Sequence, residues 1–244
     1  GLLNDMNGFH VRAEHLHAAL AAATGGPVAE GGVGGGTGMV CHEFKGGIGT
    51  ASRVIDEALG GLTVGALVQA NYGKREWLRV DGVPVGAEIG RDEVPSPYDQ
   101  AEALHTSTPP HGSGSIIVVL ATDAPLLPHQ CERLAQRAGL GIARAGGTGG
   151  HTSGDLFIAF STGNRLPQET EGRSKTVTYD VKAVGDGVID ALFDGAIEAT
   201  EEAIINALVA AQTTVGRDGV TAYALPHDRL LDVMAAHGRG PRPA

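Results

Sequence analysis

The sequence feature that most constrains how this chain can fold and act is a glycine-rich stretch at residues 144–154 that leads directly into an apolar strand. The stretch reads Arg-Ala-Gly-Gly-Thr-Gly-Gly-His-Thr-Ser-Gly, and Asp155 and the run Leu-Phe-Ile-Ala-Phe follow at once. Because glycine tolerates strained backbone conformations, this order can present Ser153 at the mouth of a strand. Such a serine suits a chain that cuts itself, then uses the hydroxyl as nucleophile and the new amine as base. A surface loop before a buried strand is the alternative interpretation.

Length and composition favour an ordinary globular domain and argue against two classes of partner. The chain has 244 residues, of which 42% are hydrophobic and 19% are charged, and its formal net charge is −10. Lysine and arginine never cluster in runs longer than two, which argues against nucleic-acid binding. No apolar run approaches the ~20 residues that span a bilayer. We therefore expect one domain over residues 1–244, with neither a nucleic-acid nor a membrane partner.

Hydrophobic periodicity predicts groups of strands separated by helices, which is typical of α+β layers rather than of a regular βαβ array. Strands are expected at residues 39–44, 63–71, 116–122, 155–162, 175–184 and 221–225, with a hairpin at 77–85. Helices are expected at residues 11–23, 126–140, 190–213 and 227–236, with a long surface loop at 90–114. The chain starts at Gly1 without a signal-like segment, so we expect an N-terminal piece to be absent here. The compartment, cytoplasmic or periplasmic, stays open.

Other motifs can be considered as a phosphate-binding loop or as a metal site. The run Gly34-Gly-Gly-Thr-Gly38 is similar to the glycine signature of tubulin-like GTPases and could hold a phosphate with its N–H groups. A strand-like segment follows it, however, where nucleotide-binding folds usually have a helix. No set of His, Cys, Asp and Glu has zinc-like spacing, and His151 is too near Ser153 in the chain to act as its base. We expect neither a metal nor another cofactor.

Two polar residues at the borders of apolar runs are candidates for the chemistry. Asn71 ends a buried strand, where its amide could donate to an oxyanion or could simply cap the strand. Glu202 precedes the run Ala-Ile-Ile-Asn-Ala-Leu, so its carboxylate could be partly buried and would then need a partner such as an ammonium group. A solvated acidic face of the helix is the alternative for this region.

Six ordered segments resemble the self-processing serine aminopeptidases. This is the L-aminopeptidase/D-esterase and β-peptidyl aminopeptidase group, often called DmpA-type. The segments are residues 27–39, 44–50, 68–72, 121–128, 153–162 and 199–204, which together extend over nearly the whole chain. The resemblance implies an αββα sandwich of the type shared with ornithine acetyltransferase. It also implies a tetramer of processed units and a small peptide, amide or ester as substrate.

The resemblance further implies a cut just before Ser153, which leaves two fragments, 1–152 and 153–244, that stay together. Ser153 would then be the nucleophile of an aminopeptidase, and the family's hydroxyl and carboxylate partners fall on Thr200 and Glu202. Asn71 and a backbone N–H would hold the oxyanion. An acyltransferase on the same scaffold and an inactive homologue with a structural role are the alternatives.

The sequence departs from the family pattern at the cleavage site. Thr152 stands where the family usually has glycine, and a β-branched residue restricts the strained conformation that cleavage needs. Cleavage could therefore be slow or could shift to Thr152. Thr200 also stands where serine is expected, which is a milder change.

The glycine loop near residue 30 is the expected place for the substrate's amine. Glu30 could hold the N-terminal ammonium group with its carboxylate, with Gly35 and Gly36 as neighbouring substrate-binding residues. A residue in a surface turn is the alternative interpretation of Glu30.

Overall fold

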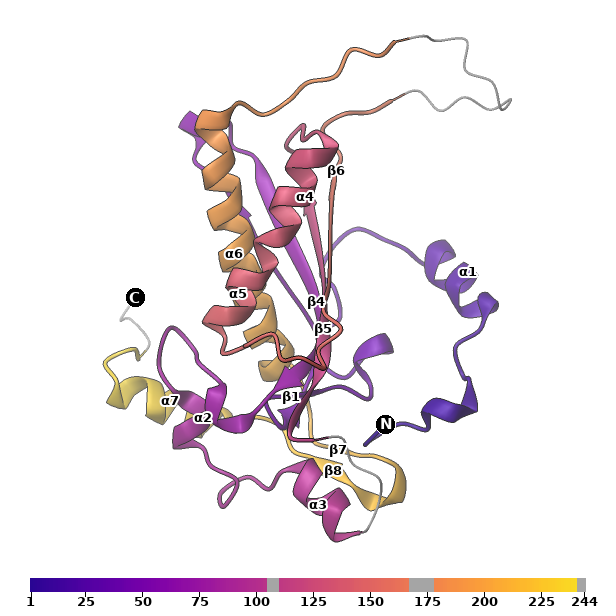
Figure 1. Cartoon of the computed structure of the whole chain (residues 1–244), viewed down its shortest axis with the longest axis vertical. Helices are drawn as coiled ribbons and strands as arrows, with labels where there is room; N and C mark the ends of the chain where they lie inside the picture. Colours follow the sequence, from indigo (N-terminus) through magenta and orange to yellow (C-terminus); the bar gives the residue numbers. More distant parts are fainter. Residues whose placement is uncertain (105–109, 167–177, 241–244) are drawn as a thin grey trace.

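The computed structural model describes residues 1–104, 110–166 and 178–240, built around one four-stranded mixed sheet (Figure 1). The strand order is β3 (Gly47–Val54), β4 (Thr63–Gly73), β5 (Gly112–Thr122) and β6 (Leu156–Ser161). The first three strands pair antiparallel, and β6 joins β5 in parallel. Parallel neighbours need a long crossover, and here helices α4 (Pro128–Gln136) and α5 (Ala138–Arg144) supply it.

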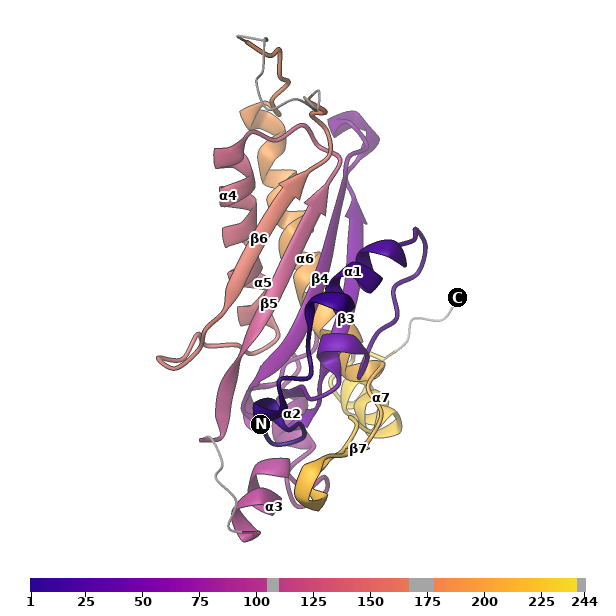
Figure 2. The same ribbon diagram turned by 90° about the vertical axis from the view of Figure 1, so that its right-hand side faces the viewer.

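One face of the sheet is covered by helices and holds the core (Figure 2). The longest helix, α6 (Asp186–Val209), packs across β3 and β4, while α4 packs on β5 and β6. Side chains in β4 alternate, and those that face α6 are buried: Val64, Ala66, Val68, Ala70 and Tyr72. Gly49 of β3 lets α6 approach closely, because a Cβ there would lie 1.9 Å from the carbonyl oxygen of Ala203.

The opposite face of the sheet remains largely uncovered within the described ranges. Leu156, Ile158 and Phe160 of β6 are 63%, 57% and 47% exposed on it. The segment 26–28 lines a cavity on this face with residues of β3, β4 and β5. The described residues thus form one helical layer and one sheet of the expected four-layer sandwich.

Smaller elements surround the end of the sheet where β4 terminates and β5 begins (Figure 1). Two short strand pairs are β1 (Val40–Cys41) with β2 (Phe44–Lys45), and β7 (Thr214–Val215) with β8 (Thr221–Ala222). The remaining α-helices of the described chain are α1 (Ala13–Ala21), α2 (Val85–Glu88), α3 (Pro97–Ala103) and α7 (His227–Ala236). No helix in the described part of the chain is long and apolar enough to cross a membrane.

The structure confirms several expected elements and corrects others. The strands expected at 63–71, 116–122 and 155–162 are β4, β5 and β6, and the long helix is α6. The helix expected at 126–140 is two helices, and the hairpin expected at 77–85 is a single bridge between Val80 and Val83. The strand expected at 175–184 is not present over residues 178–184, and residues 175–177 lie outside the described residues. The loop expected at 90–114 contains α3 and the start of β5.

Candidate active site

Ser153 lies in the loop between α5 and β6, where its hydroxyl meets a carboxylate. The Oγ atom of Ser153 is 2.5 Å from Oδ1 of Asp155 and 3.1 Å from the carbonyl oxygen of Gly114. Since a hydroxyl has one proton, it donates to one of these acceptors at a time, and the carboxylate is the stronger acceptor. The structure therefore presents a serine hydroxyl already hydrogen-bonded to an anionic group.

Glycines shape the loop that leads to Ser153. Gly146 and Gly149 have φ values of +103° and +59°, and a Cβ on Gly146 would lie 1.9 Å from the carbonyl oxygen of Trp77. The backbone N–H of Ser153 then donates to the Gly150 carbonyl at 2.8 Å, which closes a turn. The predicted presentation of the serine by glycine-rich backbone is thus visible in the geometry.

Asn71 stands next to the same point of β5 that Ser153 contacts. Its Oδ1 accepts a hydrogen bond from the Val40 N–H at 3.0 Å, which turns Nδ2 toward Gly114. A Cβ on Gly114 would lie 3.1 Å from this Nδ2. No described residue accepts a hydrogen bond from Nδ2, which lies beside the residue that Ser153 touches. Asn71 itself lines a separate, smaller cavity of ≈ 120 Å³ together with Ser113 and Gly114.

Ser153 and Asp155 line a cavity of ≈ 280 Å³ at the end of β4. Its other walls include Tyr72, Lys74, Trp77, His111, Ile142 and Thr152. The Tyr72 hydroxyl is buried and has no hydrogen-bond partner among the described residues. Burial, followed by the charges of Cys41 and Asp155, raises the pKa of Tyr72, so the phenol keeps its proton. A buried donor without a partner in a cavity wall is a group that a ligand can satisfy.

A buried charge cluster supports one wall of this cavity. Glu43 is fully buried and accepts two hydrogen bonds from Arg91, at 2.8 and 2.7 Å, while His111 lies 3.2 Å away. Burial raises the pKa of Glu43, but hydrogen bonds from Arg91, Ser96 and His111 outweigh it and hold the value at about 2. The opposite ring nitrogen of His111 lies 3.2 Å from Asp99. This cluster could not be predicted from the sequence, because its members are far apart in the chain.

The glycine loop is held from inside by a buried lysine. Lys45 Nζ donates to the carbonyl oxygens of Gly36, Met39 and Gly46 at 2.9, 3.1 and 2.7 Å. Gly35 packs against the side chain of Gln69, where a Cβ would come within 2.1 Å. Lys45 is therefore engaged with backbone carbonyls, which gives no support to the phosphate-loop interpretation.

Three other predicted site residues have partners away from Ser153. Glu30 Oε1 accepts from the N–H and the hydroxyl of Thr50, each at 2.6 Å. Thr200 is buried in α6, where its hydroxyl donates to the Ala196 carbonyl. Glu202 pairs with Arg53 of β3 at 2.5 Å. None of these hydrogen bonds involves Ser153, so the site roles of Glu30, Thr200 and Glu202 stay predictions.

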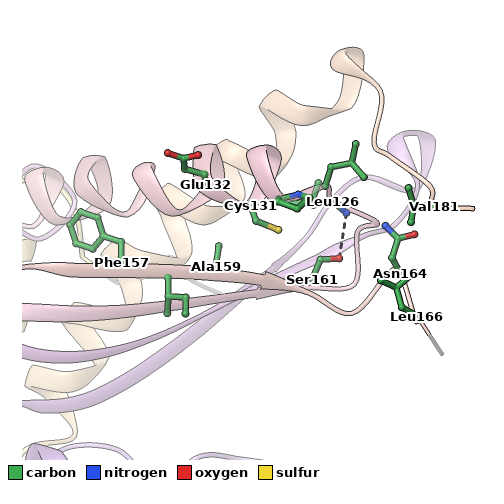
Figure 3. A pocket seen from close by; sticks show the side chains of 12 residues that line it. Leu126, Cys131, Glu132, Phe157, Ala159, Ser161, Asn164, Leu166 and Val181 are labelled. Carbon is green, nitrogen blue, oxygen red and sulfur yellow. Dashed lines mark hydrogen bonds between the residues drawn. The ribbon is translucent and has the colours of Figure 1, made fainter. Parts of the chain in front are cut away.

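A larger cavity lies elsewhere, between α4 and the edge strand β6 (Figure 3). It measures ≈ 530 Å³, and Cys131 and Ala159 lie between the helix and the strand there. Ser161, at its end, donates to the Ala124 carbonyl and accepts from Leu126. The partners of the Ser161 hydroxyl in the described part of the chain are backbone groups, among them the N–H of Gly163, rather than a carboxylate. The described residues also contain no group of three or more His, Cys, Asp or Glu that could hold a metal.

A serine presented at the start of a strand, with a carboxylate on its hydroxyl and a free amide donor nearby, is an arrangement of serine-nucleophile hydrolases. The chain belongs to peptidase family S58, whose family profile matches residues 1–222.

Individual relatives agree with this assignment. The chain is 48% identical over 241 residues to β-peptidyl aminopeptidase BapA of Sphingosinicella microcystinivorans, an alignment that covers 98% of this chain and 60% of that protein. A solved β-aminopeptidase from Burkholderia sp. has 56% identity and a TM-score of 0.86, with 100% of this chain and 63% of that chain covered. The chain thus spans about 60% of the length of these relatives.

A second solved structure defines the fold class. It is the L-aminopeptidase D-Ala-esterase/amidase from Ochrobactrum anthropi, described as a prototype for the serine aminopeptidases and a variant of the Ntn hydrolase fold. Its identity is 45% and its TM-score 0.85, with 98% of this chain and 61% of that chain covered. The likeness confirms the predicted family and the α+β sandwich.

Proposed function

We propose that this chain is the core of a serine aminopeptidase that activates itself by cutting between Thr152 and Ser153. The observation that carries the proposal is the position of Ser153, with its hydroxyl hydrogen-bonded to Asp155 and Gly114 and the amide of Asn71 on the other side of Gly114. The glycine-rich approach and the membership of peptidase family S58 support the same activity. The fragments of this chain would be residues 1–152 and 153–244.

In the cut protein, the new α-amine of Ser153 is the base. An α-amine has a reference pKa of about 8, so a useful fraction is neutral near pH 7–8 and can take the hydroxyl proton. The Ser153 oxygen then attacks the substrate carbonyl, and the amine returns the proton to the leaving nitrogen. Water releases the acyl group by the same path in reverse. Asn71 Nδ2 and a backbone N–H donate to the oxyanion, each a contribution of about 2.7–4 kcal/mol.

The substrates we propose are small peptides, amides and esters with a free N-terminal amine. The relatives are named for β-peptidyl substrates in one case and for L-amino-acid and D-Ala substrates in another. A cavity of ≈ 280 Å³ fits a residue or two rather than a folded protein. No observation favours the acyltransferase alternative, and a tetramer of processed units is a further proposal from the family.

Cleavage of the full-length protein tests the proposal directly. We expect two fragments, and N-terminal sequencing of the smaller one should begin at Ser153. Ser153→Ala should fold, stay in one piece and cleave no amino-acid p-nitroanilide, because its methyl group cannot attack a carbonyl. Amide hydrolysis by the Ala variant would place the nucleophile elsewhere. A fragment that begins at Thr152 would show that the threonine is the nucleophile.

A further inference from the structure

The cavity that Ser153 lines also contains a lysine whose charge has no anionic partner. Lys74 directly follows β4, is half-buried, and lines this cavity together with Ser153. Its Nζ lies 4.9 Å from the centroid of the Trp77 ring. No described residue accepts a hydrogen bond from this ammonium group, and no described carboxylate forms an ion pair with it. A lysine ammonium group has three donors, so Lys74 is able to bind an anion in the cavity.

The two other groups of the described wall that can carry charge near neutral pH are engaged. Both ring nitrogens of His111 lie 3.2 Å from carboxylates outside the cavity wall. The carboxylate of Asp155 is hydrogen-bonded to the Ser153 hydroxyl. Lys74 is therefore the cationic group that this part of the structure leaves open to a ligand.

We propose that Lys74 binds the C-terminal carboxylate of the substrate and thereby makes dipeptides the preferred substrates, an inference that rests on the proposed function. In a dipeptide the leaving group is one amino acid, so a free carboxylate lies one residue beyond the bond that is cut. Simple amides and esters have no carboxylate there, and longer peptides have it farther away. An ammonium–carboxylate contact is a charge-assisted hydrogen bond, which is stronger than a neutral one.

The spacing along β5 agrees with a leaving group of one residue. Ser153 Oγ lies 3.1 Å from the Gly114 carbonyl oxygen, and the stem of Lys74 packs on Gly112, where a Cβ would lie 2.4 Å from Cγ of the lysine. Gly112 and Gly114 are two residues apart, at most about 7 Å in a strand. One extended residue spans at most about 3.6 Å, and a hydrogen bond adds about 3 Å. A longer leaving group would carry its carboxylate past the point where Lys74 packs.

Trp77 holds the ammonium group beside the loop that presents the serine. It lines the same cavity, and its carbonyl oxygen lies so close to Gly146 that a Cβ there would come within 1.9 Å. The ring attracts the cation to one side and leaves N–H groups on the other side for an anion. Lys74 and the Ser153 loop are thus positioned by the same tryptophan.

The free acid and the C-terminal amide of one dipeptide differ only at the proposed contact. The full-length, cut protein should hydrolyse alanyl-alanine and β-alanyl-alanine with a kcat/KM at least ~10-fold higher than that of the corresponding C-terminal amides, the usual effect of a hydrogen bond to a charged group. The difference should lie mainly in KM, because the carboxylate is remote from the reacting atoms. Equal or lower values for the free acids would overturn the inference.

Lys74→Met removes the charge and keeps an unbranched stem. The acid-to-amide ratio of kcat/KM should fall at least ~10-fold in this variant, and a general loss of activity cancels in the ratio because both substrates share every other contact. Lys74→Arg should retain a ratio above that of the Met variant, since a guanidinium group also binds carboxylates. A wild-type ratio in Lys74→Met would overturn the inference.

Lys182→Met is the matched control. Lys182 is exposed, lies outside the cavity wall and contacts Asn164 through its backbone. Its substitution removes the same charge from the chain, so it should leave the acid-to-amide ratio at the wild-type value. A fall as large as that of Lys74→Met would show an effect of net charge and overturn the inference.

The proposed function is tested separately from the role of Lys74. Dipeptide hydrolysis by Ser153→Ala would refute Ser153 as the nucleophile, whatever the acid-to-amide ratio. A ratio of one in a protein that is cut before Ser153 and hydrolyses both forms would refute the role of Lys74 and leave the proposed function standing.

Discussion

Acidification should destabilise the fold through His42, which lies in the turn between β1 and β2. His42 is completely buried, and burial is the main reason why its pKa falls from 6.5 to about 4. Its Nδ1 lies 2.9 Å from the Lys74 carbonyl, and its Nε2 has no partner among the described residues. The ring is therefore neutral in the folded chain at neutral pH.

The sign and size of the effect follow from this shift. Between pH 6.5 and 4 the unfolded chain binds a proton at His42 that the folded chain does not, so the free energy of unfolding falls as the pH falls. A pKa lowered from 6.5 to about 4 corresponds to about 3 kcal/mol of unfolding free energy, which is lost fully below pH 4. Glu43 acts in a different window, because its lowered pKa removes stability as the pH falls from 4.5 toward 2.

Urea unfolding at a series of pH values measures this loss. The uncut Ser153→Ala protein is the background, since it keeps the chain in one piece. His42→Asn is the comparison, because asparagine tolerates the φ of +47° and can still donate to the Lys74 carbonyl. The difference in unfolding free energy between the two proteins should change by about 3 kcal/mol between pH 7 and pH 4. Parallel curves over this range would refute the reasoning.

Further expected outcomes concern the site and its support. Asn71→Ala should lower kcat about 100- to 1,000-fold with little change in KM, and an unchanged kcat would remove Asn71 from the oxyanion site. Lys45→Met should lower the free energy of unfolding on the order of 3 kcal/mol in urea titrations, since three carbonyls lose a charged donor. Amino-acid p-nitroanilides should be cleaved and their N-acetylated forms should not. Comparable rates for the free-amine and the N-acetylated substrates would contradict the aminopeptidase assignment. Glu30→Gln should raise the KM for free-amine substrates only if Glu30 binds the substrate's amine.

Elements with strong periodicity could be predicted, whereas β3 could not. Strand β4 alternates buried and partly exposed residues along its length, and α6 carries apolar residues at helical spacing. By contrast, β3 reads Gly-Ile-Gly-Thr-Ala-Ser-Arg-Val, with glycines that normally weaken a strand. It forms because β4 pairs with it and because Gly49 admits the backbone of α6. Contacts between distant segments overrode the local preference here.

The helix over residues 13–21 shows the opposite case. Its sequence predicts an apolar stripe, and the helix α1 forms as expected. Leu16 and Leu20 are nevertheless 61% and 67% exposed, because no described element packs on them. Local sequence determines that such a segment is helical, but it does not determine what covers the helix.

For the site, the sequence by itself predicted Ser153 as the nucleophile and showed the glycine-rich loop that precedes it. Glycine conformations are local, so the run before Ser153 and the strand after it could be read from residues 144–160 alone. Tertiary structure decided what faces the hydroxyl. Asp155 is fixed by the N–H of Ile116, 39 residues away in the chain, and Glu202 pairs with Arg53 across 149 residues. Such pairs depend on strand register and helix packing, which arise only when distant segments meet in the folded chain.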